Sequence, residues 1–133
     1  MRLVRKTDQT TNLVNFLSPD KNHSIFTTFI GEPVVFQLGT ADAVNALKAV
    51  KVVQRDIKAV DINMGCPFKF SVAGGMGAAL LRKPEVVRDI VQTLKRNIDV
   101  PVTCKVRVLE NVDESLELVR RIEKSGADVH LIN

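Results

Sequence analysis

The chain has 133 residues, of which 45% are hydrophobic and 26% are charged, enough apolar material for one domain with a modest core. No apolar run approaches the length of a membrane span and the first residues lack a secretory signal, which argues against a membrane-spanning or secreted protein. The net charge of +4 and the pI near 9.3 permit a polyanionic partner, and a solvated surface explains them equally well.

The cysteine content bears on compartment and metal chemistry. The two cysteines, Cys66 and Cys104, form no regular disulfide framework, so we expect an intracellular protein, in the cytoplasm or alternatively the nucleus. The cysteines lie far apart in the sequence, and His23 and His130 stand at no recognisable ligand spacing. We therefore expect no metal site.

The first third of the chain predicts strands and one helix. Residues 1–22 are polar, and we expect them to precede a domain at residues 23–133. Two β-rich runs follow at Ser24–Phe29 and Pro33–Leu38, separated by a turn at Gly31 and Glu32. Thr40 or Asp42 can cap the helix that comes next, whose apolar residues recur at helical spacing: Val44, Leu47, Val50 and Val53.

The remainder alternates strands with helices. The apolar run Ile57–Ile62 and the run Pro101–Arg107 are typical of buried strands, and Ala127–Ile132 starts another. Pro84 suits the first turn of a helix, and its apolar residues are Val86, Val87, Ile90, Val91 and Leu94. A last helix, capped by Asp113 and ending at Gly126, carries Leu116, Leu118, Val119 and Ile122.

This alternation predicts an α/β fold with a parallel sheet, either a barrel or an open doubly wound sheet. A G-x-G-x-x-G motif does not follow the first strand, which weakens the dinucleotide-binding alternative.

One cysteine stands where α/β proteins place their chemistry. Cys66 follows the strand predicted at Ile57–Ile62, and a loop at the carboxyl end of a parallel strand is the usual place for an active site. Gly65 lets the backbone turn and Pro67 fixes the next φ angle. A purely structural, packed cysteine is the alternative interpretation. Three nearby glycines are expected to shape a loop and a close helix approach: Gly74, Gly75 and Gly77.

Polar residues end three consecutive predicted strands, which indicates a binding site: Gln37, Asn63, Cys66, Lys105 and Arg107. Gln37 or Asn63 could instead tie down a loop, and Arg107 could be a surface cation. Lys105 is harder to explain structurally, because an unpaired ammonium is costly to bury within an apolar strand. Cys104 is most simply a small core residue.

Four segments resemble the flavin-dependent tRNA-dihydrouridine synthases, and the resemblance covers roughly residues 24–126. They occur in the family's order: Val34–Thr40, Asp61–Pro67, Gly74–Leu81 and Pro101–Arg107. The residues of these segments are most similar to those of the eukaryotic branch that modifies a D-loop uridine of cytoplasmic tRNA. The resemblance implies an FMN-binding (β/α)8 TIM barrel with a helical tRNA-binding domain.

The resemblance also implies a reaction and residue roles. NADPH reduces FMN, the flavin passes hydride to the uracil of tRNA, and a thiol protonates the neighbouring carbon, giving 5,6-dihydrouridine. Cys66 matches that proton donor. Gln37 and Lys105 match residues that bind the flavin, Asn63 resembles the asparagine that orients the base, and Arg107 is expected to support this site or an RNA phosphate.

The sequence departs from the family at both ends. The family's first strand has no counterpart before Met1. His130 comes too early for the histidine of the family's His-Gly-Arg motif and Asn133 sits near the expected place, so neither receives that role. The later strands that hold the FMN phosphate are also missing. We therefore expect a partial barrel of about four parallel strands, incomplete at both ends. The alternative function is a truncated, non-catalytic product that serves at most as an interaction module.

Overall fold

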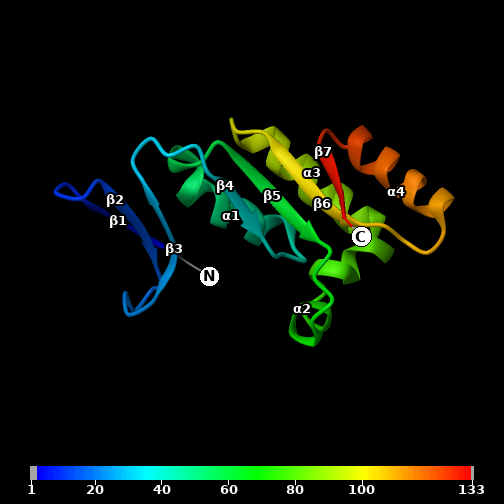
Figure 1. Ribbon diagram of the computed structural model, residues 1–133, viewed down its shortest axis with the longest axis horizontal. Coiled ribbons are helices and arrows are strands. Elements are labelled where there is room, and N and C mark those ends of the chain that lie inside the picture. The colour runs from blue at the N-terminus through cyan, green and yellow to red at the C-terminus, as the bar shows by residue number, and fades with distance from the viewer. Residues whose placement is uncertain (1–2, 133) are drawn as a thin grey trace.

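The computed structural model describes residues 3–132, so Asn133 lies outside the described residues (Figure 1). The strands form two sheets, an antiparallel one of order β1-β2-β3 and a parallel one of order β4-β5-β6-β7. The parallel sheet consists of β4 (Val35–Leu38), β5 (Ala59–Met64), β6 (Val102–Arg107) and β7 (Asp128–Ile132). The helices are α1 (Ala43–Val53), α2 (Lys69–Ala73), α3 (Pro84–Asn97) and α4 (Val112–Lys124), with short 3-10 turns η1 (Gln54–Asp56) and η2 (Gly77–Arg82).

The helices α1, α3 and α4 lie on one side of the parallel sheet (Figure 1). The strand side chains that face them form the core, which is fully or almost fully buried: Val60, Ile62, Met64, Val102, Cys104 and Val106. The opposite face of the sheet has no helix over it among residues 3–132 and carries the polar members of the same strands. Side chains alternate between the two faces of a strand, so one face could become core while the other stayed available.

The sequential strand order distinguishes a barrel from a doubly wound sheet. A doubly wound sheet reverses its strand order and carries helices on both faces. Here β4, β5, β6 and β7 lie side by side in chain order with their helices on one side, as in a barrel wall. The expected α/β fold with about four parallel strands is confirmed, and it corresponds to half the strands of a closed (β/α)8 barrel.

The antiparallel sheet was not foreseen. Residues 1–22, expected to be a polar segment, contain β1 (Val4–Asp8) and β2 (Leu13–Leu17), and β2 also pairs with β3 (Ser24–Phe29). The expected boundary at residue 22 therefore falls in the loop between two paired strands.

This sheet packs on the rest of the molecule, because Val14 and Phe16 of β2 belong to the same buried core as the parallel sheet. The rings of Phe26 and Phe36 meet edge to face with centroids 5.1 Å apart. The guanidinium of Arg5 pairs with Asp56 at 2.8 Å. The antiparallel sheet is thus also joined to β4 through an aromatic contact and to η1 through an ion pair, neither of which a local sequence pattern reveals.

The N-cap of α1 is one of the two predicted candidates, whereas the N-cap of α4 differs from the predicted residue. Asp42 caps α1, because its carboxylate accepts a hydrogen bond from the amide of Asn45 at 2.7 Å. At α4 the cap is Asn111, not Asp113 as predicted: its side-chain oxygen accepts from the amides of Asp113 and Glu114. Asp113 lies two residues after the cap, in the first turn of α4, where its negative charge is near the positive end of the helix dipole.

The buried face of α1 is also rotated from the predicted one. Val50 and Val53 are buried as expected, but Val44 is 57% exposed and Leu47 is only half-buried. Two alanines, Ala43 and Ala46, face the core in their place. The large apolar residues misled the prediction, because small side chains can line the contact between a helix and its neighbours. For α3 the predicted face is correct, with Val87, Ile90, Val91 and Leu94 buried.

Candidate functional site

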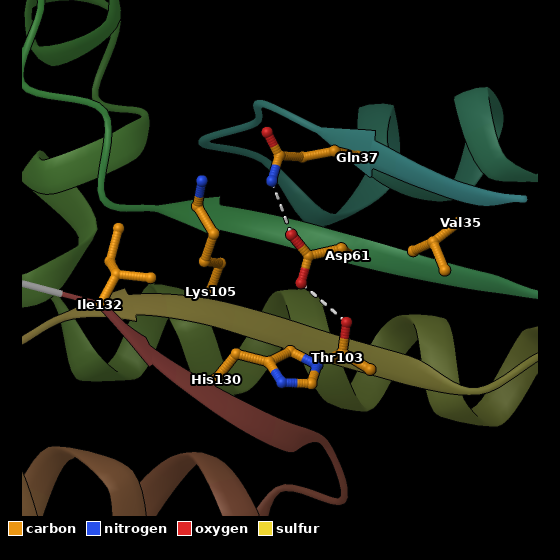
Figure 2. Close-up of a pocket in the computed structure, with 7 residues that line it drawn as sticks. All are labelled: Val35, Gln37, Asp61, Thr103, Lys105, His130 and Ile132. Carbon is orange, nitrogen blue, oxygen red and sulfur yellow. Dashed lines mark hydrogen bonds between the residues drawn. The ribbon is translucent and has the colours of Figure 1, made fainter.

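A cavity of about 320 Å³ opens on the helix-free face of the parallel sheet (Figure 2). All four strands contribute to its lining: Val35, Gln37, Asp61, Thr103, Lys105, His130 and Ile132. The parallel register places Gln37 beside Asp61 and Asp61 beside Thr103. Two residues further along β6, Lys105 lies beside His130 of β7. The volume lies at the low end for ligand pockets, and the polar groups converge on it from neighbouring strands.

Asp61 is the buried centre of this arrangement. Its side chain is only 6% exposed, and both carboxylate oxygens accept hydrogen bonds. Gln37 donates from Nε2 at 2.8 Å and Thr103 from Oγ1 at 2.7 Å, as Figure 2 shows. Asp61 and Thr103 were missed as site residues. The signal was present, because Asp61 is an acidic residue in an otherwise apolar strand.

A second set of hydrogen bonds leads from Gln37 to the cysteine turn. Asn63 donates from Nδ2 to Oε1 of Gln37 at 3.0 Å. Its own Oδ1 accepts from the backbone amides of Gly65 and Cys66, both at 3.0 Å. Three predicted site residues from different strands and loops, Gln37, Asn63 and Cys66, are therefore connected through side-chain amides.

The segment after the cysteine closes the turn from the other side. The amide of Ala78 donates to the carbonyl of Cys66 at 2.9 Å. Gly77 has φ +59°, and a Cβ there would lie 2.6 Å from both the Cys66 carbonyl and the Ser71 hydroxyl. The expected close approach at Gly77 is confirmed, because a side chain at this position would collide with the backbone of the cysteine turn.

Gly65 serves a different purpose from the one expected. Its φ is not in the left-handed region, so the turn itself does not demand glycine. A Cβ at this position would instead approach Cδ1 of Ile132 to 2.9 Å. The carbonyl of Gly65 accepts a hydrogen bond from Nε of Arg107 at 3.2 Å, which ties the turn to the end of β6. Cys66 is half-buried and lies beside the cavity without lining it.

The ammonium-bearing side chain of Lys105 and the imidazole of His130 both line the cavity. Lys105 is half-buried, and among residues 3–132 its ammonium has no hydrogen-bond or ion-pair partner. His130, which received no role in the sequence analysis, pairs with Lys105 across the sheet and also lines the cavity. A cation that lines a cavity and has no partner within residues 3–132 is suited to an electron-rich ligand.

The other cysteine lies on the core side of β6. Cys104 is fully buried, as expected for a core residue. Burial raises the pKa of its thiol from 9.0 to about 12, and the negative charge of Asp61 adds to the shift. A thiol in this state is not a nucleophile at neutral pH, so Cys66 is the chemically accessible one of the pair.

Two aromatic rings lie exposed next to the cysteine turn. Phe68 and Phe70 are 67% and 74% exposed, and their rings stack with centroids 6.3 Å apart and an interplanar angle of 12°. They flank Lys69 at the start of α2, a short helix that the sequence analysis did not predict.

Among residues 3–132, no helix is both long and apolar enough to cross a membrane.

Comparison with protein families identifies the chain's relatives. The family described as "Dihydrouridine synthase (Dus)" matches residues 2–132. The chain is 37% identical, over 121 residues, to a tRNA-dihydrouridine(20) synthase (NAD(P)+) of Schizosaccharomyces pombe, and the match covers 86% of this chain and 25% of the relative. It is 32% identical over 138 residues to the protein of that name in Saccharomyces cerevisiae, covering 95% of this chain and 36% of that one.

A human relative extends the comparison to another tRNA position. The chain is 33% identical over 107 residues to a tRNA-dihydrouridine(20a/20b) synthase (NAD(P)+)-like protein, and the match covers 77% of this chain and 34% of the relative. The chain thus spans between a quarter and roughly a third of the length of these relatives.

Proposed function

Because the chain belongs to the dihydrouridine synthase family, we propose that the protein containing it reduces a D-loop uridine of tRNA to 5,6-dihydrouridine, using FMN as cofactor and NADPH as reductant. The observation that carries the proposal is the family match over residues 2–132, supported by relatives named as tRNA-dihydrouridine synthases dependent on NAD(P)+. We also propose that residues 23–133 belong to the FMN-binding barrel domain and that the protein acts in the cytoplasm.

The cavity residues fit the polar edge of a flavin. Gln37 uses one N–H and one oxygen lone pair within the protein, which leaves a second N–H and a second lone pair for a ligand. Lys105 offers a positive charge that has no partner among the described residues, and such a charge stabilises an electron-rich ring. FMN, when bound, supplies the hydride chemistry that no side chain can perform.

Cys66 is suited to give a proton to the uracil. Thiols are mostly protonated near neutral pH, and this one is half-buried on a turn held by Asn63 on one side and Ala78 on the other. A general acid is effective only when it is held in place relative to the reacting atom. We assign it the role of proton donor.

The neighbouring residues would bind the RNA. Asn63 holds the turn and retains a further amide N–H toward the substrate base, and Arg107 retains guanidinium N–H groups for a phosphate or for the site itself. The exposed rings of Phe68 and Phe70 offer surfaces on which bases can stack. A target uracil must leave the base stack to be reduced, so such contacts beside the cysteine support an RNA substrate.

The test separates the two half-reactions in the protein that contains this chain. In Cys66→Ala, flavin reduction by NADPH should stay close to the wild-type rate, because the thiol acts only once the uracil has received hydride. Dihydrouridine formation should fall by about 10² to 10⁴, the contribution of a positioned general acid. The first half-reaction is followed by flavin absorbance and the second by mass spectrometry of the tRNA.

Cys104→Ala is the matched control, since it removes the chain's other thiol from the opposite face of the sheet. It should retain dihydrouridine formation in molecules that fold. Wild-type turnover in Cys66→Ala would contradict the assigned role, and a wild-type protein that leaves uridine unchanged in the presence of FMN and NADPH would contradict the proposed function.

A further inference from the structure

We propose that Asp61 is a positioning residue: by accepting hydrogen bonds only, it fixes the orientation of the Gln37 and Asn63 amides and thereby holds the backbone of the Cys66 turn. The proposal rests on the proposed function for its catalytic meaning, but its structural content is independent of flavin and tRNA. Asp61 does not touch Cys66, and it acts through the two amides between them.

The chain of hydrogen bonds has a direction, and Asp61 fixes one end of it. A carboxylate has no hydrogen to donate, so Gln37 must turn its NH₂ group toward Oδ2 of Asp61. The Gln37 oxygen then points to Asn63 and requires a donor there, which Nδ2 of Asn63 supplies at 3.0 Å. Each amide orientation is therefore dictated by its neighbour.

The other end of the chain demands the same direction. The backbone amides of Gly65 and Cys66 are donors, so the atom of Asn63 that faces them must be its oxygen. That choice places Nδ2 of Asn63 against Gln37, in agreement with the orientation set by Asp61. If Gln37 were reversed, its oxygen would meet the Asp61 carboxylate, so that two acceptors faced each other. Two donors would also meet, either between Gln37 and Asn63 or, if Asn63 reversed as well, between Asn63 and the backbone amides.

Burial makes the direction costly to reverse. Asp61 is 6% exposed, so water cannot readily replace a lost partner. Its second oxygen is occupied by Thr103, whose hydroxyl donates at 2.7 Å. Thr103 helps to satisfy the carboxylate but has no place in the path from Gln37 to Cys66, which makes it the natural control position.

The same direction determines what Gln37 presents to the cavity. With one N–H directed to Asp61 and one lone pair to Asn63, the remaining donor and acceptor of Gln37 have fixed positions. Asp61 would thus set two properties at once: the hydrogen-bond pattern offered to a ligand in the cavity and the rigidity of the cysteine turn.

The experiment compares Asp61→Asn with Thr103→Val by hydrogen exchange, measured by NMR on the purified protein without flavin or tRNA. Asparagine has the size of aspartate but is neutral, and its NH₂ group can face Gln37 as well as Thr103. The direction of the chain is then no longer fixed from this end, and the bond that Gln37 donates to a neutral oxygen is weaker than the bond it donates to a carboxylate. Exchange at these two amides should accelerate about tenfold in Asp61→Asn, the factor that corresponds to the loss of one ordinary hydrogen bond. Thr103→Val leaves Asp61 a carboxylate and should leave both exchange rates within about twofold.

Cys104 reports whether the variants are folded. It is fully buried, so iodoacetamide should label it only in unfolded molecules, while Cys66 is labelled in the native state. If Asp61→Asn does not fold, the amide orientations can be read in the wild type instead: the Gln37 NH₂ protons should show nuclear Overhauser contacts to the Cβ protons of Asp61, and those of Asn63 should not contact the Cys66 amide.

Two results would overturn the proposal. One is unchanged exchange at Gly65 and Cys66 in folded Asp61→Asn, or equal acceleration in Thr103→Val, which would make Asp61 merely a buried structural carboxylate. The other is a reversed amide orientation in the wild type. Neither depends on dihydrouridine formation, so a failure of the proposed function remains distinguishable from a failure of this one.

Discussion

Cys66 and Cys104 illustrate how the environment separates two identical side chains. Cys66 lies half-buried on a turn at the carboxyl ends of the strands, whereas Cys104 is fully buried on the helix-covered face of the sheet. The pKa of the Cys104 thiol is raised to about 12, chiefly by burial. The sequence alone left a structural role open for both cysteines, and only exposure and contacts distinguish them.

The raised pKa of Cys104 predicts a loss of stability in alkali. Between pH 9.0 and about 12 the unfolded chain releases the Cys104 proton while the folded protein retains it. The folded state then binds more protons, so the free energy of unfolding falls as the pH rises above 9.0. At pH 10 the loss from this group should be roughly 1 to 2 kcal/mol relative to pH 7.

Urea unfolding at pH 7 and pH 10 measures this loss, with Cys104→Ala as the comparison. The variant should be less stable at both pH values because of the cavity it leaves, but its drop between them should be smaller than that of the wild type by roughly 1 to 2 kcal/mol. Equal drops would show that the thiol does not carry the pH dependence.

Lys105 gives a second prediction at this scale, made for the protein that contains the chain. Lys105→Met keeps most of the stem and removes a charge that lines the cavity. If this charge stabilises a reduced flavin, the variant should have a lower flavin reduction potential and should retain FMN less well. Redox titration against a reference dye measures the potential; a value equal to that of the wild type would make Lys105 a structural residue.

Among the elements, the N-terminus of α4 offers the clearest test of a corrected prediction. Asn111→Ala removes the oxygen that accepts from the amides of Asp113 and Glu114, and it should lower the free energy of unfolding by about 1 kcal/mol. Asp113→Ala should cost only about 0.3 kcal/mol, because this exposed carboxylate acts through the helix dipole alone. Chemical denaturation compares the two; a larger cost for Asp113→Ala would restore the original prediction.

Several elements could be predicted because their signal is local. The faces of α3 and β6 follow from periodicity, and Gly126 takes a positive φ of 103° after α4, as its place in the sequence suggested. Other features depend on partners distant in the chain. β1 has little apolar alternation, and its strand conformation comes with pairing to β2.

In the candidate site, too, some features have a local sequence signal and others depend on partners distant in the chain. Its five predicted residues end neighbouring strands or follow them, and a parallel sheet brings such positions to one edge. The hydrogen bonds of Asp61 and Thr103 required the register between strands, which a single sequence does not provide. Side-chain roles assigned from the resemblance remain predictions, and Cys66 itself lies beside the cavity and not on its wall.

On the scale of the whole molecule, the parallel sheet has two edges within residues 3–132. β4 pairs only with β5 and β7 only with β6, so four strands form one wall of a barrel-like layer. A closed (β/α)8 barrel uses eight strands, and its cofactor phosphate is usually held after the last two. We propose that the described residues supply the ring-binding side of the flavin site and the cysteine, whereas the function assignment itself depends on the family match over residues 2–132.

The most direct test of that assignment is the dihydrouridine content of tRNA in the source cells. We predict that disrupting the gene removes dihydrouridine from a D-loop position, and that a wild-type copy restores it while a Cys66→Ala copy expressed at the same level does not. Mass spectrometry of isolated tRNA reads the modification as a gain of two hydrogens on the uridine. An unchanged D-loop after disruption, or full restoration by Cys66→Ala, would contradict the account.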